Sequence, residues 1–272
     1  MIRSLGNCKS VILHVVLKYK NDYWHFMKCT ALHCIRIFHM LPLTFNFDRG
    51  IGLLFEDRTQ AAVMLAGKLQ WLKERWANSL IVLAIPRGGV VTGEVIANAL
   101  GASLDVVVAK KVGDPLNPEF AIGAVMHDGS FIPNEDVISS LNVPKQYIEE
   151  SVSVLKKEID RRLIKFRGNK TYHLVGKVAL LVDDGVATGT TMFAAIKWLK
   201  TQRLKKLIVA IPVGPRDTIE KLKDIVDELI VLHSPSIFGA VGAFYQNFSQ
   251  VTDDEVVEIM RKYRANLIPN DS

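Results

Sequence analysis

From residue 55 onward, the spacing of hydrophobic residues alternates between two patterns. Short runs rich in Val, Ile and Leu are typical of strands buried in a parallel sheet. Longer segments in which apolar residues recur every three or four positions are typical of amphipathic helices. The first pattern predicts strands at residues 80–85, 104–109, 121–126, 130–133, 177–182, 206–211 and 228–232. The second predicts helices at residues 57–77, 90–100, 145–166, 190–201, 216–225 and 253–263.

The regular alternation of strands and helices predicts the fold class. We expect an α/β fold, a doubly wound, mostly parallel sheet with helices on both faces. The longest predicted helix, residues 145–166, carries apolar residues at helical spacing and a charged face that is expected to be solvated.

The composition is that of an ordinary globular protein, with 49% hydrophobic and 23% charged residues among 272. The formal net charge of +6 is unevenly placed. Residues 1–54 contain seven basic and two acidic side chains, whereas the remaining residues contain 27 basic and 26 acidic ones. Because the main part of the chain is nearly neutral, general polyanion binding has little support, and no nucleic acid is expected as a partner.

The domain organisation predicted from these patterns has three parts: an N-terminal extension of doubtful structure (1–54), a main domain (55–265) and a C-terminal tail (266–272). The extension contains all three cysteines and has no sustained period. Cys29, His33, Cys34 and His39 have spacings that a helical metal site could use, but they match no standard zinc motif. We favour a poorly ordered extension or a segment translated from upstream of the true start, with Met40 as a candidate initiator.

Cysteine usage and hydropathy predict the compartment. The main domain lacks cysteine, which suits a reducing environment, and no uninterrupted apolar span approaches the length of a membrane helix. The N-terminus does not match a signal peptide, because Lys18, Lys20 and Asp22 follow its apolar run too soon. The expected location is cytoplasmic, with no membrane association.

The most informative segment is Val178-Ala179-Leu180-Leu181-Val182-Asp183-Asp184-Gly185-Val186-Ala187-Thr188-Gly189-Thr190-Thr191. A buried strand ends in two carboxylates, and a small, hydroxyl-rich turn leads into a helix, which is where open α/β sheets bind ligands. Unpaired N–H groups at the helix start and the helix dipole favour a phosphate in this turn. The two acids suit sugar hydroxyls or a hydrated Mg²⁺. An ordinary turn with a helix cap is the alternative for Asp-Asp-Gly alone, but the whole string favours a ribose 5-phosphate site.

A second turn of this kind contains Arg87, Gly88 and Gly89 after the strand 80–85. The glycines allow consecutive N–H groups to converge on one anion, and the arginine offers a planar fork. Lys110 and Lys111 follow the next predicted strand, toward the same sheet edge. The alternative for the Arg87-Gly88-Gly89 segment is a plain turn without a ligand, and the alternative for the two lysines is a solvated surface pair.

The complete string 178–191 resembles the phosphoribosyl pyrophosphate signature of the type I phosphoribosyltransferases, and the resemblance covers about residues 55–265. A group of bacterial and archaeal family members, whose natural acceptor is generally unassigned, is similar in five further segments. These are Asp57-Arg58, Pro86-Arg87-Gly88-Gly89-Val90, Asn117-Pro118-Glu119, Ala121-Ile122-Gly123-Ala124-Val125 and Phe238-Gly239-Ala240-Val241-Gly242. No counterpart is recognised for residues 1–54.

The resemblance implies a reaction and a set of site residues. Pyrophosphate on carbon 1 of phosphoribosyl pyrophosphate is displaced by a nitrogen acceptor such as a nucleobase, with Mg²⁺ on the leaving group, as a step of nucleotide metabolism. Asp183 and Asp184 are assigned to the ribose hydroxyls and, with Lys111, to catalysis. The 5-phosphate is assigned to Ala187, Thr188, Gly189, Thr190 and Thr191. Pyrophosphate is assigned to Arg87, Gly88, Gly89 and Lys110. Mg²⁺ is expected to be held mainly by the substrate, with Asp183 and Asp184 as candidate ligands.

The acceptor and the partner are less well determined by sequence. Phe238, Val241 and Phe244 are candidates for a hood that stacks a planar base, although core packing explains the phenylalanines equally well. The loop 113–119 is a candidate flap or an ordinary connection. The resemblance also implies a homodimer. Two alternative functions are a regulator that senses phosphoribosyl pyrophosphate without transfer and a hydrolase that reuses the same site.

Overall fold

The computed structural model of this chain describes residues 12–19, 23–30, 55–118 and 120–264. The chain divides into two compact units, Met1–Gly50 and Ile51–Ser272. In the first unit, β1 (Ile12–Tyr19) and β2 (Tyr23–Thr30) form an antiparallel pair. The metal-site hypothesis concerns residues that lie outside the described ones, except for Cys29, of which only the backbone in β2 is described. Met40 and the tail 266–272 also lie outside them.

The second unit is built on a five-stranded parallel sheet in the order β10-β9-β8-β3-β4. Its strands are β3 (Leu80–Ala84), β4 (Ser103–Val106), β8 (Val178–Val182), β9 (Lys206–Val213) and β10 (Glu228–His233). Every residue of β3 and β8 is buried, as their continuous apolar runs predict for central strands.

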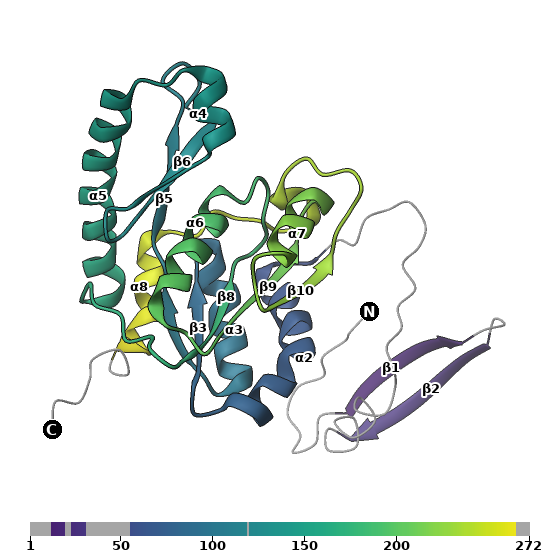
Figure 1. The fold of residues 1–272 in the computed structure, drawn as a ribbon. Helices are drawn as coiled ribbons and strands as arrows, with labels where there is room; N and C mark the ends of the chain where they lie inside the picture. The colour runs from purple at the N-terminus through teal and green to yellow at the C-terminus, as the bar shows by residue number, and fades with distance from the viewer. Residues whose placement is uncertain (1–11, 20–22, 31–54, 119, 265–272) are drawn as a thin grey trace, which may run out of the picture. The chain divides into compact units, whose positions relative to one another are not determined.

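Helices cover both faces of this sheet (Figure 1). The helices α2 (Arg58–Trp76), α3 (Gly88–Leu100) and α8 (Asp253–Arg261) pack on the face that includes Val82 and Leu180. The helices α6 (Thr190–Leu199) and α7 (Arg216–Lys223) pack on the face that includes Leu83 and Leu181. The predicted fold class is therefore confirmed. The chain also has two short 3-10 turns, η1 (Lys200–Gln202), which follows α6, and η2 (Val241–Phe244), which packs with Phe55 and Tyr245.

A smaller antiparallel sheet, which we call the hood sheet, rises beside the parallel one. It consists of β5 (Ala109–Gly113), β6 (Ala121–Met126) and β7 (Phe131–Pro133). The helices α4 (Glu135–Leu141) and α5 (Lys145–Arg167) follow, and Figure 1 shows α5 running along the hood sheet. The sequence prediction of one strand over 104–109 was wrong, because the run Val106-Val107-Val108 spans the break between β4 and β5 and hides it. The short helix α4 was not predicted.

A buried ion pair attaches the end of α5 to the parallel sheet. Arg167 donates from Nε to Oδ1 of Asp105 at 2.6 Å and from Nη2 to Oδ2 at 2.8 Å. Their side chains are only 1% and 3% exposed. The guanidinium also donates to the backbone oxygens of Asn169 and Thr171 and lies 3.8 Å from the ring centroid of Tyr172. Because α5 belongs to the hood and Asp105 to β4, this pair joins the two sheets.

No helix among the described residues is long and apolar enough to cross a bilayer.

Replacement of Arg167 by Met should destabilise the second unit by about 3–5 kcal/mol, because the Asp105 carboxylate would remain buried without its cation. Urea unfolding of the purified chain measures this. The exposed pair between Lys170 and Asp160 provides a matched control, since Lys170→Met should change the free energy of unfolding by less than about 1 kcal/mol. Equal effects of the two substitutions would contradict an anchoring role for Arg167.

Candidate active site at the junction of two turns

Two strand-to-helix turns lie side by side at the carboxyl edge of the parallel sheet. Strands β3 and β8 are hydrogen-bonded neighbours, and their last residues, Ala84 and Val182, are in register. The strand order changes direction here, since β4 lies on one side of β3 while β8, β9 and β10 lie on the other. Open α/β sheets bind ligands at such a switch point. The structure therefore brings the two motifs predicted from the sequence into one place.

The acids of one turn lie directly against the glycines of the other. A Cβ atom on Gly88 would lie 1.8 Å from Oδ2 of Asp184, and one on Gly89 would lie 2.8 Å from Oδ1 of Asp183. No side chain fits at either position without moving a carboxylate. Glycine is therefore required here for close approach.

Both turns present backbone N–H groups without acceptors. Within the described part of the chain, the N–H groups of Gly88 and Gly89 make no hydrogen bond. The same holds for Ala187, Thr188 and Gly189, at the start of α6. Free N–H groups at a helix start, together with the helix dipole, form an anion site.

Hydrogen bonds from neighbouring elements hold the 185–191 turn in place. The N–H of Val186 donates to the oxygen of Val213 at 2.9 Å, and Oγ1 of Thr218 donates to the oxygen of Ala187 at 2.9 Å. Gly189 adopts a φ of 77°, which favours glycine. Ala187 and Thr188 are exposed. The turn is thus open to a ligand and anchored by β9 and α7.

The two carboxylates have different surroundings. Asp183 is half-buried, and the loss of solvation around its carboxyl, followed by the charge of Asp184, raises the pKa of this carboxyl well above the ordinary value. Its Oδ1 accepts a hydrogen bond from the N–H of Asp184 at 2.8 Å. Oδ2 of Asp184 instead accepts from Nε of Arg58 at 2.6 Å. One acid therefore has a cation and the other has none in direct contact.

Arg58 and Tyr245 were not predicted as site residues. Arg58 is the first residue of α2, and its sequence signal was the shared segment Asp57-Arg58. Tyr245 follows η2, and its hydroxyl donates to the backbone oxygen of Asp184 at 2.5 Å. Burial raises the pKa of the Tyr245 hydroxyl, which keeps it a donor. Neither contact has a local sequence pattern, because both join segments far apart in the chain.

The side chains predicted to bind pyrophosphate lie in two different parts of the structure. Nη1 of Arg87 lies 3.6 Å from Oδ1 of Asp253 at the start of α8. The prediction that Lys110 and Lys111 end a strand of the parallel sheet was wrong, because both lie within β5 of the hood sheet. Nζ of Lys110 pairs with Glu158 of α5 at 2.8 Å.

Lys111 lies on the opposite face of the hood sheet. It is in register with Ala124, whose side chain packs in the same cluster as Met192 and Ala195 of α6. Lys111 is exposed and has no ion-pair partner among the residues that the structure describes. It is therefore the lysine on the side of the hood sheet that packs on α6, the helix that follows the 185–191 turn.

The candidates for stacking the acceptor, which are not part of the hood sheet, pack mainly on one another. They are Phe238, Val241 and Phe244. The rings of Phe238 and Phe244 are stacked with centroids 5.1 Å apart, and Phe244 is only 9% exposed, in a cluster with Phe55 and Tyr245. Core packing therefore explains Phe244. Val241 is half-buried. It lies against the turn of residues 183–191, which we call the acid turn, since a Cβ on Gly185 would lie 2.5 Å from Cγ1 of Val241.

The donor set limits how a metal ion would bind. Among the described residues, no group of three or more His, Cys, Asp and Glu side chains could hold a metal. Asp183 and Asp184 provide hard oxygen ligands, which fit Mg²⁺ when it takes its remaining ligands from a phosphorylated substrate and water.

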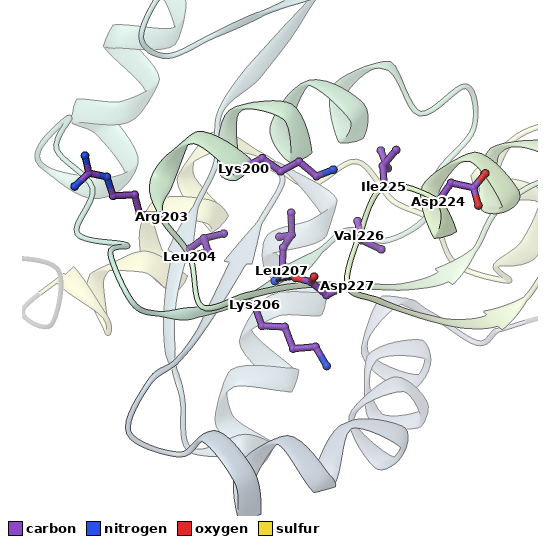
Figure 2. Close-up of a pocket in the computed structure, with 9 residues that line it drawn as sticks. All are labelled: Lys200, Arg203, Leu204, Lys206, Leu207, Asp224, Ile225, Val226 and Asp227. Atoms are coloured by element: carbon purple, nitrogen blue, oxygen red, sulfur yellow. Dashed lines mark hydrogen bonds between the residues drawn. The ribbon is translucent and has the colours of Figure 1, made fainter.

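An open cavity of about 350 Å³ lies at the opposite edge of the sheet (Figure 2). It is formed between η1 and the turn that precedes β10, near the amino end of β9. Its lining residues are Lys200, Arg203, Leu204, Lys206, Leu207, Asp224, Ile225, Val226 and Asp227. Since the two turns lie at the carboxyl ends of the strands, this cavity is not part of the candidate site.

Comparison with known proteins agrees with this geometry. Residues 56–246 match the family model described as the phosphoribosyl transferase domain. Proteins from two strains of Mycobacterium tuberculosis, each named putative phosphoribosyl transferase, are 38% identical over 208 residues, which is 76% of this chain and 46% of theirs. The chain therefore spans less than half the length of these curated relatives.

A solved structure shows the same fold. The crystal structure of TT1426 from Thermus thermophilus is 36% identical, covers 78% of this chain and 99% of its own, and superposes with a TM-score of 0.66. The family match over most of the chain, the adjacent glycine and acid turns and this likeness lead to one conclusion: the chain belongs to the phosphoribosyl transferase family.

Proposed function

We propose that this chain transfers the 5-phosphoribosyl group from phosphoribosyl pyrophosphate to a nitrogenous acceptor and releases pyrophosphate. The observation that carries the proposal is the contact between the acid turn of β8 and the glycine turn of β3. It offers one polar site for sugar hydroxyls between two separate anion sites. Phosphoribosyl pyrophosphate has this arrangement of groups, with a phosphate on carbon 5, two hydroxyls and a pyrophosphate on carbon 1.

The 5-phosphate is assigned to the 187–191 turn. Free N–H groups of Ala187, Thr188 and Gly189 and the dipole of the ten-residue helix α6 all favour a dianion there. The hydroxyls of Thr188 and Thr190, whose oxygens lie 3.2 Å apart, add donors. Thr191 follows in the first turn of the helix.

The ribose hydroxyls are assigned to the two acids. Oδ2 of Asp184 accepts from Arg58, and we assign Oδ1 of the same carboxylate to a sugar hydroxyl. Asp183 lies deeper, against Gly89. Together they fix the ring between the two anion sites.

Pyrophosphate is assigned to the N–H groups of Gly88 and Gly89, with Arg87 and Lys111 as cationic partners. Arg87 reaches the anion if its side chain leaves Asp253. Lys111 is available from the hood side. Mg²⁺, held by substrate oxygens and by Asp183 or Asp184, would neutralise charge on the leaving group when bound.

The chemistry needs no covalent intermediate with the protein. The bond from carbon 1 to the pyrophosphate oxygen breaks and its electron pair leaves with pyrophosphate. The acceptor nitrogen supplies the electron pair of the new bond and loses a proton to solvent. The turns contribute orientation and charge stabilisation. Among the candidates for stacking the acceptor, Val241 is the best placed to touch it, because it lies against the turn that follows Asp183 and Asp184.

The double substitution Asp183→Asn, Asp184→Asn should abolish binding of phosphoribosyl pyrophosphate with Mg²⁺ while the fold is retained. Both sugar-hydroxyl acceptors lose their charge in this variant. Calorimetric titration, followed by a pyrophosphate-release assay with candidate nucleobases, tests the proposal. Absence of binding to the folded wild-type chain would refute it. Binding without release for any acceptor would favour a sensor of phosphoribosyl pyrophosphate, and release of phosphate without an acceptor would favour a hydrolase.

Replacement of Gly88 by Ala should reduce turnover to background, because the new Cβ would lie 1.8 Å from Oδ2 of Asp184 and displace it. Gly67→Ala in α2 is the matched control, since nothing lies within 4 Å of its added Cβ. That control should keep full turnover and gain about 0.5–1 kcal/mol of stability. Steady-state pyrophosphate release measures both variants. Full activity of Gly88→Ala would show that the two turns need not touch.

Asp183→Asn should raise the melting temperature of the ligand-free chain at about pH 8. The folded pKa of Asp183 is raised, so the folded state binds more protons than the unfolded state between the ordinary carboxyl pKa and the raised one. Stability therefore falls as the pH rises through that interval. The amide removes this loss, and the difference between the variants should shrink toward about pH 4. Thermal unfolding across this pH range provides the measurement, and a less stable Asn variant at the alkaline end would contradict the assignment.

A further inference from the structure

Arg58 occupies an unusual place for a cation. It is the first residue of α2, where the helix dipole disfavours positive charge, and Asp57 already caps this helix by accepting from the N–H of Gln60 at 2.8 Å. Its side chain is only 10% exposed. The charge of Arg58 therefore does not stabilise the helix. The role of this arginine must come from the groups that its guanidinium contacts.

Three contacts fix the guanidinium beside the acid turn. Nε donates to Oδ2 of Asp184 at 2.6 Å, and Nη1 donates to the backbone oxygen of Ser249 at 2.7 Å. The guanidinium carbon lies 3.8 Å from the ring centroid of Phe248. A planar, forked cation can make all three contacts at once, whereas a lysine ammonium cannot.

The backbone on either side of Arg58 is fixed as well. Phe55 donates to the oxygen of Phe244 at 2.8 Å and accepts from the N–H of Gln246 at 2.7 Å. Asn247 donates to the oxygen of Glu56 at 2.9 Å. The start of α2 and the segment 244–249 therefore form one rigid support, which reaches the acid turn through Arg58 and Tyr245.

We propose that Arg58 is a positioning residue that holds Oδ2 of Asp184, so that Oδ1 is presented to a ribose hydroxyl. This inference rests on the function proposed above. The contact between Nε of Arg58 and Oδ2 holds the Asp184 carboxylate in one orientation beside Gly88, so that its other oxygen can face a bound sugar.

The test compares Arg58→Gln, Arg58→Lys and Arg75→Gln by calorimetric titration of phosphoribosyl pyrophosphate with MgCl₂ at neutral pH. Arg75 is an exposed arginine in the last turn of the same helix, away from the site, and serves as the control. Arg58→Gln should weaken binding about tenfold to hundredfold at neutral pH. Arg58→Lys should restore part of the affinity, because it keeps a cation near Asp184, and Arg75→Gln should match the wild type.

A double-mutant cycle separates positioning from general support of the fold. Asp184→Asn alone should weaken binding but leave it measurable, because Asp183 and both anion sites remain. If Arg58 acts through Asp184, then Arg58→Gln or Arg58→Lys should change the affinity of the Asp184→Asn chain less than about threefold. An equal loss in both backgrounds would overturn the inference. If Arg58→Gln does not fold, the double-mutant cycle is measured with Arg58→Lys instead.

The outcomes distinguish this inference from the proposed function. If the folded wild-type chain binds no phosphoribosyl pyrophosphate at any pH, the proposed function fails and the role of Arg58 fails with it. If the wild type binds and the Arg58 variants behave like Arg75→Gln, only the inference fails.

Discussion

The parallel pairing of β3 with β8 is the constraint on which the candidate site depends. The register that aligns Ala84 with Val182 makes both strands end at the same level of the sheet. Each strand then turns directly into a helix, so the turns must pass within contact distance. The acids after β8 consequently meet the backbone after β3, and only glycine at positions 88 and 89 leaves room for them. The same arrangement directs the positive ends of α3 and α6 toward one region.

The charges of this region are balanced by residues from distant parts of the chain. Arg58 from α2 contacts Asp184, and Asp253 from α8 lies near Arg87. Among the described residues, no cation contacts Asp183 directly, and the loss of solvation around its carboxyl raises the pKa of this group. A group held in such a costly state is typical of a binding or catalytic site, since a purely structural role would favour a neutral side chain.

The hood sheet shows how neighbouring residues of the same type acquire different roles. Lys110 and Lys111 differ by one position in β5, and successive residues of a strand face opposite sides of its sheet. Lys110 meets Glu158 of α5 and helps to hold the hood together. Lys111 lies on the side that packs on α6 and remains available for an anion. The ion pair between Arg167 and Asp105 fixes the hood to the parallel sheet and so sets where Lys111 can reach.

The sequence alone determined the fold class, the helices and strands around the site and the acid turn of residues 183–191, because these depend on local patterns. Apolar runs identify buried strands, and an anion site at a helix start is built from consecutive residues. Local patterns could not separate β4 from β5, since three valines continue across the break. Only the tertiary structure decided that Arg58 and Tyr245 support Asp184, that Lys110 is engaged and Lys111 is not, and that Phe244 belongs to the core. Each of these depends on a contact between segments far apart in the chain, and such contacts arise from packing and register, which leave no trace in the spacing of neighbouring residues.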